Sequence, residues 1–584
     1  MKEFIRLKDD LKKNGWQITV GLAALLVVDI LQLLIPRVTK YAIDELTLGK
    51  ATAYKLLLYG IEILLIGLAI GGLRYVWRYF LLGSARRIEK ALRERLFIHL
   101  QSLSYEFFLK TEVGEIMAHA TNDIEAIRMS LAMGLVFWVD TIVLGLLTIF
   151  FMIYIQPWLT LYAIIPMPLI TFVTLFFGRI IHRRFENLQK TFGKLTEKVR
   201  ESIAGIRIIK AYVKEENEKQ KLSKIGEEYI QSNINLTKVW GIFFPLILFL
   251  SNISLVIVLY FGGRLAILQT ISMGDFVAFI SYLGMLSWPM MALGWAINVI
   301  QRGSASMKRI NRIFDETPKV SNPSPSTIFH IDRLKGRIEI KGLTYKTNDG
   351  FTVLRDINLK ICEGEKLAIV GKMGAGKSIL CDLITRILEP PEGCIFIDDQ
   401  EIHQIPIKTL RSSMGYIPQE TILFSYTIRE NIALGKIYAK EKEIIRVAQI
   451  AEIYHEIKEF PKGMDTLVGE KGITLSGGQR QRICIARAIL MDPSILIFDD
   501  SFSSIDFQTE ERILENLKEF LEGKTTIMIT HRIAPLRRVD RIIVFDQGRI
   551  VEEGDHYSLL AKGGLYARIY WQSEAEEELE QEDP

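Results

Sequence analysis

Six apolar stretches in the first half of the sequence constrain its fold most strongly. Each has about the 20 residues that a helix needs to cross the roughly 30 Å hydrocarbon core of a bilayer. They are Trp16–Pro36, Leu56–Leu82, Leu135–Ile155, Leu159–Phe177, Ile242–Leu265 and Phe276–Val299. The mean hydropathy of +0.20 is high for a soluble protein, and the first stretch carries a single charge, Asp29. The sequence therefore predicts six membrane-spanning helices.

The basic residues between these stretches predict how the helices are oriented. Two long inner segments are strongly basic, with Arg86, Arg87, Lys90, Arg93 and Arg95 in the first and Arg179, Arg183, Arg184, Lys190, Lys194 and Lys198 in the second. The short turn at 156–158 has no basic residue, and the loop at 262–274 has only Arg264. Because cytoplasmic loops are rich in Lys and Arg, we expect a multi-pass protein of the cytoplasmic membrane with both termini in the cytosol.

The two inner segments are also rich in Leu, Glu, Lys and Arg, which favour helix. At about 1.5 Å per residue, the membrane helices would extend tens of ångströms into the cytosol as antiparallel pairs. We expect turns at Thr111–Gly114 and Ala204–Gly205, with short helices near Thr121–Asp123 and Arg207–Tyr212 that contact another domain. The alternative is a solvated helical hairpin without a partner.

The periodicity of the sequence changes after residue 310. Residues 311–335 include the Pro- and Ser-rich run Pro318–Pro325, which is typical of a linker. Residues 336–572 alternate short apolar runs with helical stretches, which predicts an α/β domain. Its expected strands include Ile338–Ile340, Leu367–Val370, Cys394–Ile397, Ile495–Phe498, Thr526–Ile529 and Ile542–Phe545. We therefore expect an all-α membrane domain at 1–310 that begins with a helix on the membrane surface, then the linker, the α/β domain and a disordered acidic tail at 573–584.

One run in the second half has the spacing of a phosphate-binding loop. It consists of Gly371, Lys372, Met373, Gly374, Ala375, Gly376, Lys377 and Ser378, between an apolar strand and a predicted helix. The glycines let the backbone wrap around a phosphate, Lys377 neutralises the β- and γ-phosphate oxygens, and Ser378 offers a hydroxyl to Mg2+. The run predicts that this domain binds ATP with Mg2+.

A second run, Leu475–Gln479, opens another helix. Its residues Ser476, Gly477, Gly478 and Gln479 would present backbone N–H groups and a hydroxyl to an anion. The strand expected after this helix ends at Asp499 and Asp500. Asp499 is placed to hold Mg2+ or its water, and Asp500 is placed to polarise the attacking water.

Charge and cysteine content bear on two further classes of function, nucleic-acid binding and metal binding. The 72 basic and 68 acidic residues nearly balance, so net charge gives no argument for a nucleic-acid partner. The cysteines, Cys362, Cys381, Cys394 and Cys484, lack the spacing of metal ligands. We interpret all four as small buried side chains.

Together these features resemble ATP-binding-cassette (ABC) transporters of the exporter type, and the resemblance covers nearly the whole chain. It implies a half-transporter driven by ATP hydrolysis. By this resemblance Tyr345 stacks on adenine, Gln419 senses Mg2+ and contacts the membrane domain, and His531 touches the γ-phosphate.

The same resemblance implies a partner chain. In the family two cassettes enclose two ATP molecules, each bound by the phosphate loop of one chain and the Ser476–Gln479 run of the other. Asp506, at the end of the loop Ser503–Asp506, would then face the second cassette. Glu470 matches a segment before that run which contacts the cytosolic helix tips.

One departure from the family pattern concerns Asp500. The family's usual residue here is glutamate, the presumed general base, and aspartate is one methylene shorter. A retreat of about 1 Å from the attacking water can cost about 10²-fold in rate. Either aspartate acts through an extra water, or this chain's own site is slow, as in the shorter chain of heterodimeric bacterial multidrug exporters. We favour the heterodimer over a homodimer.

The transported substrate is not specified by the sequence. Trp288, Met290, Met291 and Trp295 suit varied hydrophobic ligands, but at this spacing they also suit helix packing. We expect export of hydrophobic or amphipathic compounds. The alternatives are a lipid flippase, a peptide exporter, or a nucleotide-gated channel or regulatory module that binds ATP without cycling.

Overall fold

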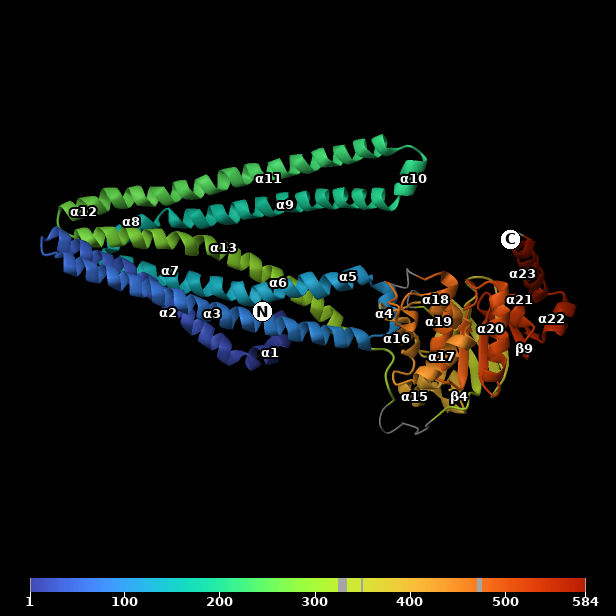
Figure 1. Ribbon diagram of the computed structural model, residues 1–584. Helices are drawn as coiled ribbons and strands as arrows, with labels where there is room; N and C mark the ends of the chain where they lie inside the picture. The colour runs from blue at the N-terminus through green and yellow to red at the C-terminus, as the bar shows by residue number, and fades with distance from the viewer. Residues whose placement is uncertain (1, 324–332, 348–349, 470–474, 583–584) are drawn as a thin grey trace. The chain divides into compact units, whose positions relative to one another are not determined.

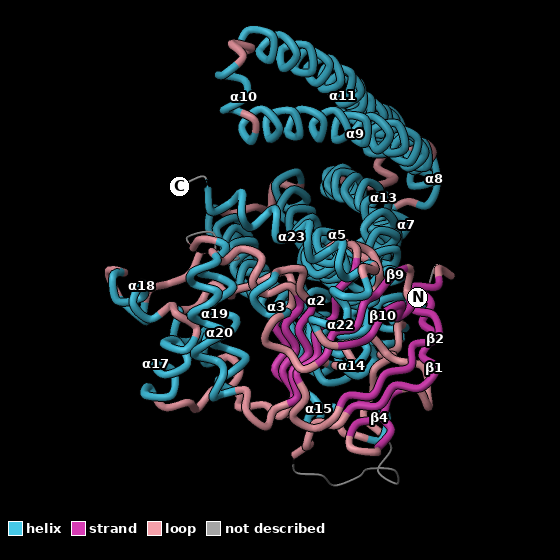
Figure 2. The backbone as a smooth tube through the Cα atoms, turned by 90° about the vertical axis from the view of Figure 1, so that its right-hand side faces the viewer, coloured by secondary structure: helices cyan, strands magenta, loops and turns pink. Residues whose placement is uncertain are grey.

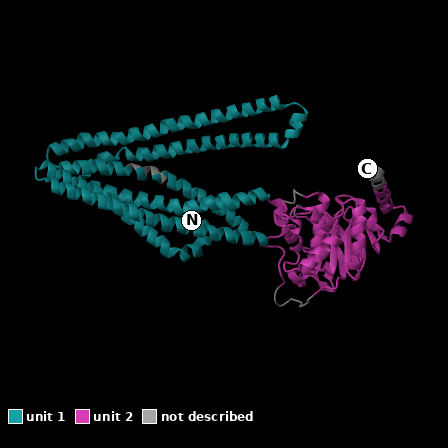
Figure 3. Cartoon of the chain, viewed as in Figure 1, with its two compact units in different colours: residues 1–101, 112–316 teal, residues 102–111, 317–584 magenta. Residues whose placement is uncertain are grey.

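The computed structural model describes residues 2–323, 333–347, 350–469 and 475–582. The chain divides into two compact units, which are coloured separately in Figure 3. Unit 1 comprises residues 1–101 and 112–316, and unit 2 comprises residues 102–111 and 317–584. Unit 1 is helical and unit 2 is α/β, which confirms the fold class predicted from the sequence.

Figure 1 shows the main helices of unit 1, all of which are long except α8 and α12. They are α2 (Gly15–Thr47), α3 (Ala53–Ser102), α7 (Leu135–Ile155), α8 (Pro157–Ile164), α9 (Met167–Ala204), α11 (Glu215–Ile257), α12 (Gly263–Ile267) and α13 (Met273–Asp315). Within the described residues, five helical runs are long and apolar enough to cross a membrane: Gly15–Thr47, Ala53–Ser102, Val113–Ile155, Pro157–Ala204 and Glu215–Ile267. The sixth predicted stretch lies in α13, whose apolar part, Met273–Leu286, is shorter.

The two inner loops differ in how well the sequence located their ends. Helices α9 and α11 run side by side and are joined at their far end by α10 (Ile206–Ala211), as predicted (Figures 1 and 2). The short helix of the first loop is instead α4 (Tyr105–Lys110), which belongs to unit 2. Thr121–Asp123 lies in the returning helical run between α5 (Val113–Ala118) and α6 (Ile124–Met129). The break predicted at Thr111–Gly114 is present, with extended backbone at Thr111 and Glu112, but the short helix lies before this break because a second extended residue, Ser104, separates α4 from α3.

Helices α2, α7 and α13 pack against one another in unit 1. The buried hydroxyl of Tyr282 on α13 donates a hydrogen bond to the Leu33 carbonyl of α2 at 2.9 Å. On the other side, the Thr141 hydroxyl of α7 donates to the Pro289 carbonyl of α13 at 3.4 Å. These bonds satisfy polar groups inside an apolar helix bundle, where leaving them unpaired would cost free energy.

Unit 2 contains two sheets. A six-stranded sheet has the order β10-β9-β3-β8-β7-β6, and a four-stranded antiparallel sheet has the order β2-β1-β4-β5. The strands are β1 (Ile338–Lys346), β2 (Thr352–Ile361), β3 (Lys366–Gly371), β4 (Ile395–Ile397), β5 (Gln400–Glu401), β6 (Met414–Ile417), β7 (Ile495–Asp499), β8 (Thr525–Ile529), β9 (Arg541–Asp546) and β10 (Arg549–Gly554). All six predicted strands are present, and β2, β5, β6 and β10 were not predicted.

The helices of unit 2 follow several of these strands (Figure 2). They are α14 (Lys377–Ile384), α15 (Ile407–Ser412), α16 (Ile428–Ala433), α17 (Glu441–Ile450), α18 (Tyr454–Glu459), α19 (Gly477–Leu490), α20 (Phe507–Phe520), α21 (Ile533–Leu536), α22 (His556–Lys562) and α23 (Leu565–Glu582). Helix α23 continues to Glu582, so residues 573–582 end a helix instead of forming the disordered tail expected. Of the cysteines interpreted as buried, Cys381 and Cys484 are buried, whereas Cys394 is half-buried and Cys362 is exposed.

Four neighbouring strands of the larger sheet place the candidate site. Strands β3, β8, β7 and β6 are parallel. Their carboxyl ends lead into Gly371, Thr530, Asp499 and Gln419 respectively. Because the carboxyl ends of parallel strands meet at one edge of the sheet, residues far apart in the sequence converge there.

Candidate nucleotide-binding site

A cleft of about 540 Å³ lies at this edge of the sheet. Its lining includes the whole predicted phosphate loop together with Gln419, Asp499, Asp500 and His531. The loop has room for backbone but not for added side chains, since a Cβ at Gly371 would lie 2.3 Å from the Phe545 carbonyl oxygen. Gly376 has φ +98°, a left-handed conformation that favours glycine, and caps the start of α14. The loop therefore presents main-chain N–H groups at a helix N-terminus, which suits a phosphate.

The charged groups of the cleft are held in place by short contacts. The Lys377 ammonium donates to the carbonyl oxygens of Gly371 at 2.7 Å and Lys372 at 2.9 Å. Burial lowers the pKa of Lys377, while Asp500 and Asp499 oppose that shift. The Ser378 hydroxyl donates to Asp499 at 3.0 Å, so a hydroxyl and a carboxylate meet where Mg2+, which prefers oxygen ligands, would bind. A Mg-nucleotide would fit these groups, because Lys377 would meet its phosphates and Ser378 and Asp499 would hold the ion.

Two further residues, Tyr416 and Asp382, help to orient the Asp499 carboxylate. The Tyr416 hydroxyl lies 3.3 Å from Asp499 Oδ2 and 3.2 Å from Asp382 Oδ1. Burial raises the pKa of the Asp382 carboxyl to about 6, although its hydrogen bond with Tyr416 lowers it. Tyr416 and Asp382 were not predicted as site residues. They act on Asp499 by fixing the direction of its carboxylate.

Asp500 lies between the two polar residues predicted to act with it. Its Oδ2 accepts a long hydrogen bond from the Gln419 amide at 3.5 Å, and its Oδ1 lies 3.4 Å from His531 Nδ1. Asp500 has a positive φ of +48°, an uncommon conformation for a residue other than glycine. Its N–H donates to the Ile529 carbonyl at 2.9 Å and so ties it to β8. The structure thus brings together Gln419, Asp500 and His531 as the sequence predicts.

The run Ser476–Gln479 lies at the start of α19 and does not line the cleft. Ser476 is the N-cap, and its hydroxyl accepts from the Gln479 N–H at 3.2 Å while the Gln479 side chain accepts from the Ser476 N–H at 2.9 Å. A Cβ at Gly478 would lie 2.8 Å from the Ser504 carbonyl oxygen. The two glycines therefore let the Ser503–Asp506 loop approach the helix start.

Two other predicted site residues also lie outside the cleft lining. Asp506 accepts from the Thr509 N–H at 2.9 Å and caps α20, so it has a structural role whether or not it contacts a partner. Tyr345 on β1 is 9% exposed and pairs with Leu354 on β2, next to Val353, which does line the cleft. Glu470 lies outside the described residues.

The Tyr345 hydroxyl donates to Glu106 of α4 at 3.3 Å. If the ring also stacks on adenine, the Tyr345→Ala substitution should weaken ATP binding by about 1 kcal/mol, or 5-fold in Kd, without slowing hydrolysis at saturating ATP. Tyr345→Phe is the matched control, because it keeps the ring and removes only the bond to Glu106. Equilibrium binding of radiolabelled ATP measures the Kd of both variants, and steady-state ATPase activity at saturating ATP measures their hydrolysis. An unchanged Kd for Tyr345→Ala would show that Tyr345 only packs the sheet.

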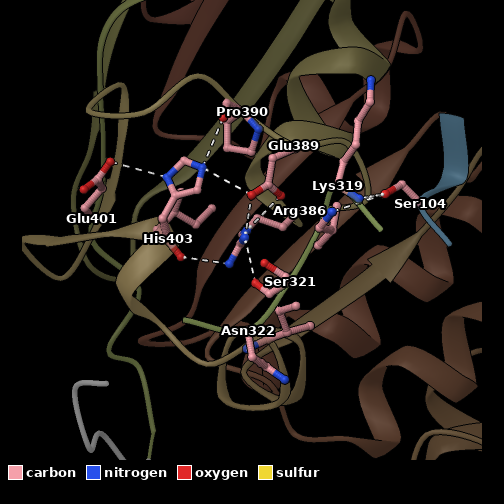
Figure 4. Close-up of polar contacts among 12 residues, drawn as sticks. Ser104, Lys319, Ser321, Asn322, Arg386, Glu389, Pro390, Glu401 and His403 are labelled. Carbon is pink, nitrogen blue, oxygen red and sulfur yellow. Dashed lines mark hydrogen bonds and ion pairs between the residues drawn. The ribbon is translucent and has the colours of Figure 1, made fainter. Parts of the chain in front are cut away.

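Linker residues 319–321 form several polar contacts with other parts of unit 2 (Figure 4). Ser104 precedes α4, and its hydroxyl accepts hydrogen bonds from the backbone N–H groups of Lys319 at 2.8 Å and Val320 at 3.2 Å. Arg386, which follows α14, donates to the Ser321 carbonyl at 3.2 Å and to Glu389 at 2.7 Å. These bonds join α4, the linker and the end of the phosphate-loop helix.

Arg386 should be among the more sensitive positions of this contact network. Its side chain is 2% exposed, so Arg386→Ala removes a buried partner of Glu389, which keeps a contact of 3.4 Å with His403, and should cost about 3 kcal/mol of stability. Arg333→Ala is the control, because Arg333 pairs with Asp492 with both side chains more than half exposed, and such pairs contribute little. The thermal unfolding midpoint of the purified protein measures both variants. Equal midpoints for the two would contradict the role assigned to Arg386.

The structure adds site residues that sequence reasoning missed. Ile569, Gln572 and Ser573 of α23 line the cleft together with the phosphate loop. They lie about 200 residues after that loop, and no motif marks them. Only the packing of α23 beside β3 reveals their position.

Comparisons with known proteins agree with this geometry. Residues 18–290 match the model of the ABC transporter transmembrane region, and residues 354–503 match the ABC transporter model. A probable multidrug resistance ABC transporter ATP-binding/permease protein of Bacillus subtilis, YheI, is 37% identical over 96% of this chain and 97% of its own. An ATP-dependent lipid A-core flippase of Syntrophus aciditrophicus is 34% identical over 98% of this chain and 94% of its own.

Solved structures give the same result. The structure of a bacterial Atm1-family ABC exporter with ATP bound matches with a TM-score of 0.80 and 26% identity, covering 95% of this chain and 98% of that one. A helical membrane unit, an ATP-binding α/β unit and full-length relatives of the same architecture therefore coincide in one chain. The chain belongs to the ABC transporter family as an exporter, a multi-pass membrane protein with an ATPase coupled to transport.

Proposed function

We propose that this chain is one half of a heterodimeric exporter of hydrophobic or amphipathic compounds, and that its own ATP site is slow. ABC exporters act as dimers, and the curated relative at 37% identity is described as a probable multidrug resistance transporter. The basic inner loops support an orientation with both termini and the ATPase in the cytosol. Mg2+ would accompany ATP, and the remaining partners would be membrane lipid and a small hydrophobic substrate.

One observation carries the proposal of a slow site. The family resemblance assigns the general base to Asp500, and Gln419 and His531 lie 3.5 and 3.4 Å from its carboxylate. Its carboxylate is a methylene shorter than that of the family's usual glutamate, and its backbone is held to β8 by the bond to Ile529. The shorter side chain therefore leaves its carboxylate farther from the attacking water.

The intact helix start at Ser476 supports a productive role in the other site. Its capping bonds at 3.2 and 2.9 Å form a regular N-terminus that suits a γ-phosphate bound by a partner chain. A shortened base at Asp500 together with an intact Ser476–Gln479 run favours two unequal ATP sites over two equal ones.

Vectorial transport tests the proposed function. Inverted membrane vesicles containing the co-expressed pair should accumulate a hydrophobic dye in a manner that needs ATP and is blocked by vanadate. Accumulation of lipid analogues alone would favour the flippase alternative, which the lipid A-core flippase relative makes relevant. Ion conductance with bound ATP and no turnover would favour a nucleotide-gated channel.

A further inference from the structure

Ser573 of α23 is buried, and its hydroxyl has no hydrogen-bond partner among the described residues. The residue is 7% exposed and lines the nucleotide-binding cleft. Serine hydroxyls inside helices often donate to a carbonyl one turn earlier, as that of Ser84 does to Phe80 at 2.7 Å, whereas Ser573 forms no such bond within the described chain. A buried polar group without a partner costs free energy and requires an explanation. A ligand in the cleft would supply the missing partner.

Buried contacts fix α23 beside the cleft. Tyr566 is fully buried, and its hydroxyl lies 2.7 Å from His556 Nδ1 of α22. Tyr570 is also buried, and its hydroxyl accepts a hydrogen bond from Arg537 at 2.6 Å. Both tyrosines pack in one apolar cluster with Val370 of β3. Helices α21, α22 and α23 lie together in unit 2 (Figure 1), so α23 forms a well-anchored wall of the cleft.

The face of α23 that lines the cleft is uncharged. Ile569, Gln572 and Ser573 are three and four residues apart and therefore share one face of the helix, and all three line the cleft. The next residue, Glu574, is not among the lining residues, and its carboxylate lies 3.6 Å from the Arg537 guanidinium. A carboxylate in the cleft would repel a phosphate, whereas a hydroxyl can donate a hydrogen bond to it. This face of α23 therefore suits a phosphate.

The neighbours of α23 indicate which phosphate lies near Ser573. Helix α23 packs against β3, whose last residue, Gly371, begins the phosphate loop. It also packs against α21, which begins at Ile533, two residues after His531. By the family resemblance, His531 touches the γ-phosphate. Ser573 thus lies on the side of the cleft formed by Gly371 and His531, where the terminal phosphate of ATP would bind.

We propose that Ser573 is a further nucleotide-binding residue, and that its hydroxyl donates a hydrogen bond to the terminal phosphate of ATP bound at this chain's own phosphate loop. ADP lacks that phosphate, so the bond forms with ATP alone. Ser573 thereby contributes to the preference of the site for ATP over ADP. This inference rests on ATP binding in the cleft, and it is independent of the transported substrate and of whether the two ATP sites are equal.

AMP-PNP and ADP test this contact, because AMP-PNP has a third phosphate and resists hydrolysis, whereas ADP has two phosphates. Equilibrium binding of each radiolabelled nucleotide to the purified chain in detergent gives the Kd, and Lys377→Ala gives the binding that does not belong to this cleft. Ser573→Ala should raise the Kd for AMP-PNP about 5- to 10-fold and leave that for ADP within about 2-fold of wild type. Ser573→Thr keeps the hydroxyl and should retain most of the affinity for AMP-PNP.

A charge at the same position should have a larger effect. Ser573→Asp places a carboxylate beside the phosphates and should weaken AMP-PNP binding by more than about 10-fold. Ser412→Asp is the matched control, because Ser412 is an exposed helical serine of unit 2 that does not line the cleft. It should leave both Kd values unchanged. Equal losses in the two aspartate variants would show that general charge governs binding and would overturn the proposal.

Thermal unfolding separates binding from packing. Because the hydroxyl of Ser573 has no hydrogen bond to lose, Ser573→Ala without nucleotide should unfold at the wild-type temperature or above it. Its stabilisation by AMP-PNP should be smaller than that of the wild type. A lower unfolding midpoint without nucleotide, together with an unchanged Kd for AMP-PNP, would show that Ser573 only packs α23. Equal weakening of AMP-PNP and ADP would contradict a contact with the terminal phosphate.

The outcome is separable from the proposed function. Wild-type Kd values for AMP-PNP in both Ser573→Ala and Ser573→Asp would overturn the role of Ser573 and leave export standing. Selective loss of AMP-PNP binding in Ser573→Ala, with no vanadate-sensitive transport by the wild-type pair, would contradict export and leave the role of Ser573 standing.

Discussion

The Ser476→Arg variant of the assembled pair should lose nearly all steady-state ATPase activity, by about 10²-fold or more. Ser476 caps α19, and its neighbours Gly477 and Gly478 leave space only for backbone beside Ser504. An arginine side chain at this position would occupy the place where the helix start meets the partner's γ-phosphate. If this run completes the hydrolysing site of the pair, as we propose, ATP hydrolysis by the whole pair should stop.

A conservative variant separates blocking from misfolding. Ser476→Thr keeps a hydroxyl that can cap α19 and should retain most activity. The ATP affinity of this chain's own phosphate loop should be unchanged in Ser476→Arg, since we propose that the run contacts the nucleotide of the partner chain. Substantial turnover in Ser476→Arg would mean that this run completes no working site.

The Lys377→Ala variant should lose ATP binding at this chain's own site by more than about 10-fold. Lys377 is partly buried at the base of the cleft and is held by the Gly371 and Lys372 carbonyls at 2.7 and 2.9 Å. It is therefore already placed to meet phosphate oxygens, and a charge-assisted bond is among the stronger ones a ligand can gain. Filter binding of radiolabelled ATP to the purified chain measures the loss.

Lys372→Ala controls for removing a positive charge from the same loop. Its side chain is exposed, so the loss of affinity should be much smaller than for Lys377→Ala. Equal losses in the two variants would show that general charge, and not the position of Lys377, governs binding.

The sequence predicted most of the architecture because its signals are local. Apolar stretches of about 20 residues and strand runs such as Ile495–Phe498 predict their own structure, and the phosphate loop predicts its own cleft. In the first inner loop the break was located correctly at Thr111–Gly114, although Gly114 itself lies inside α5, but the short helix was expected after the break and α4 lies before it. The position of α4 depends on extended residues on either side of it, which no local pattern distinguishes.

Residues that depend on tertiary packing were the ones missed. Tyr416 is positioned by its bonds to Asp382 and Asp499, and Gln572 reaches the cleft only because α23 packs beside β3. Such contacts join segments that are far apart in the sequence, and the spacing of these segments along the chain does not predict which of them will meet.

The comparison of Asp500→Asn with Ser476→Arg tests the central claim that the two ATP sites of the pair are unequal. Steady-state ATPase activity of the co-purified pair is measured for each variant, with nucleotide occupancy determined so that lost binding is not mistaken for lost chemistry. Asp500→Asn should keep activity within about 3-fold of wild type, because we propose that the site it serves is already slow, while Ser476→Arg should abolish activity. Asp500→Glu should leave activity unchanged or raise it. Loss of activity in Asp500→Asn as complete as in Ser476→Arg would show two equivalent sites and would favour a homodimer with aspartate as its base.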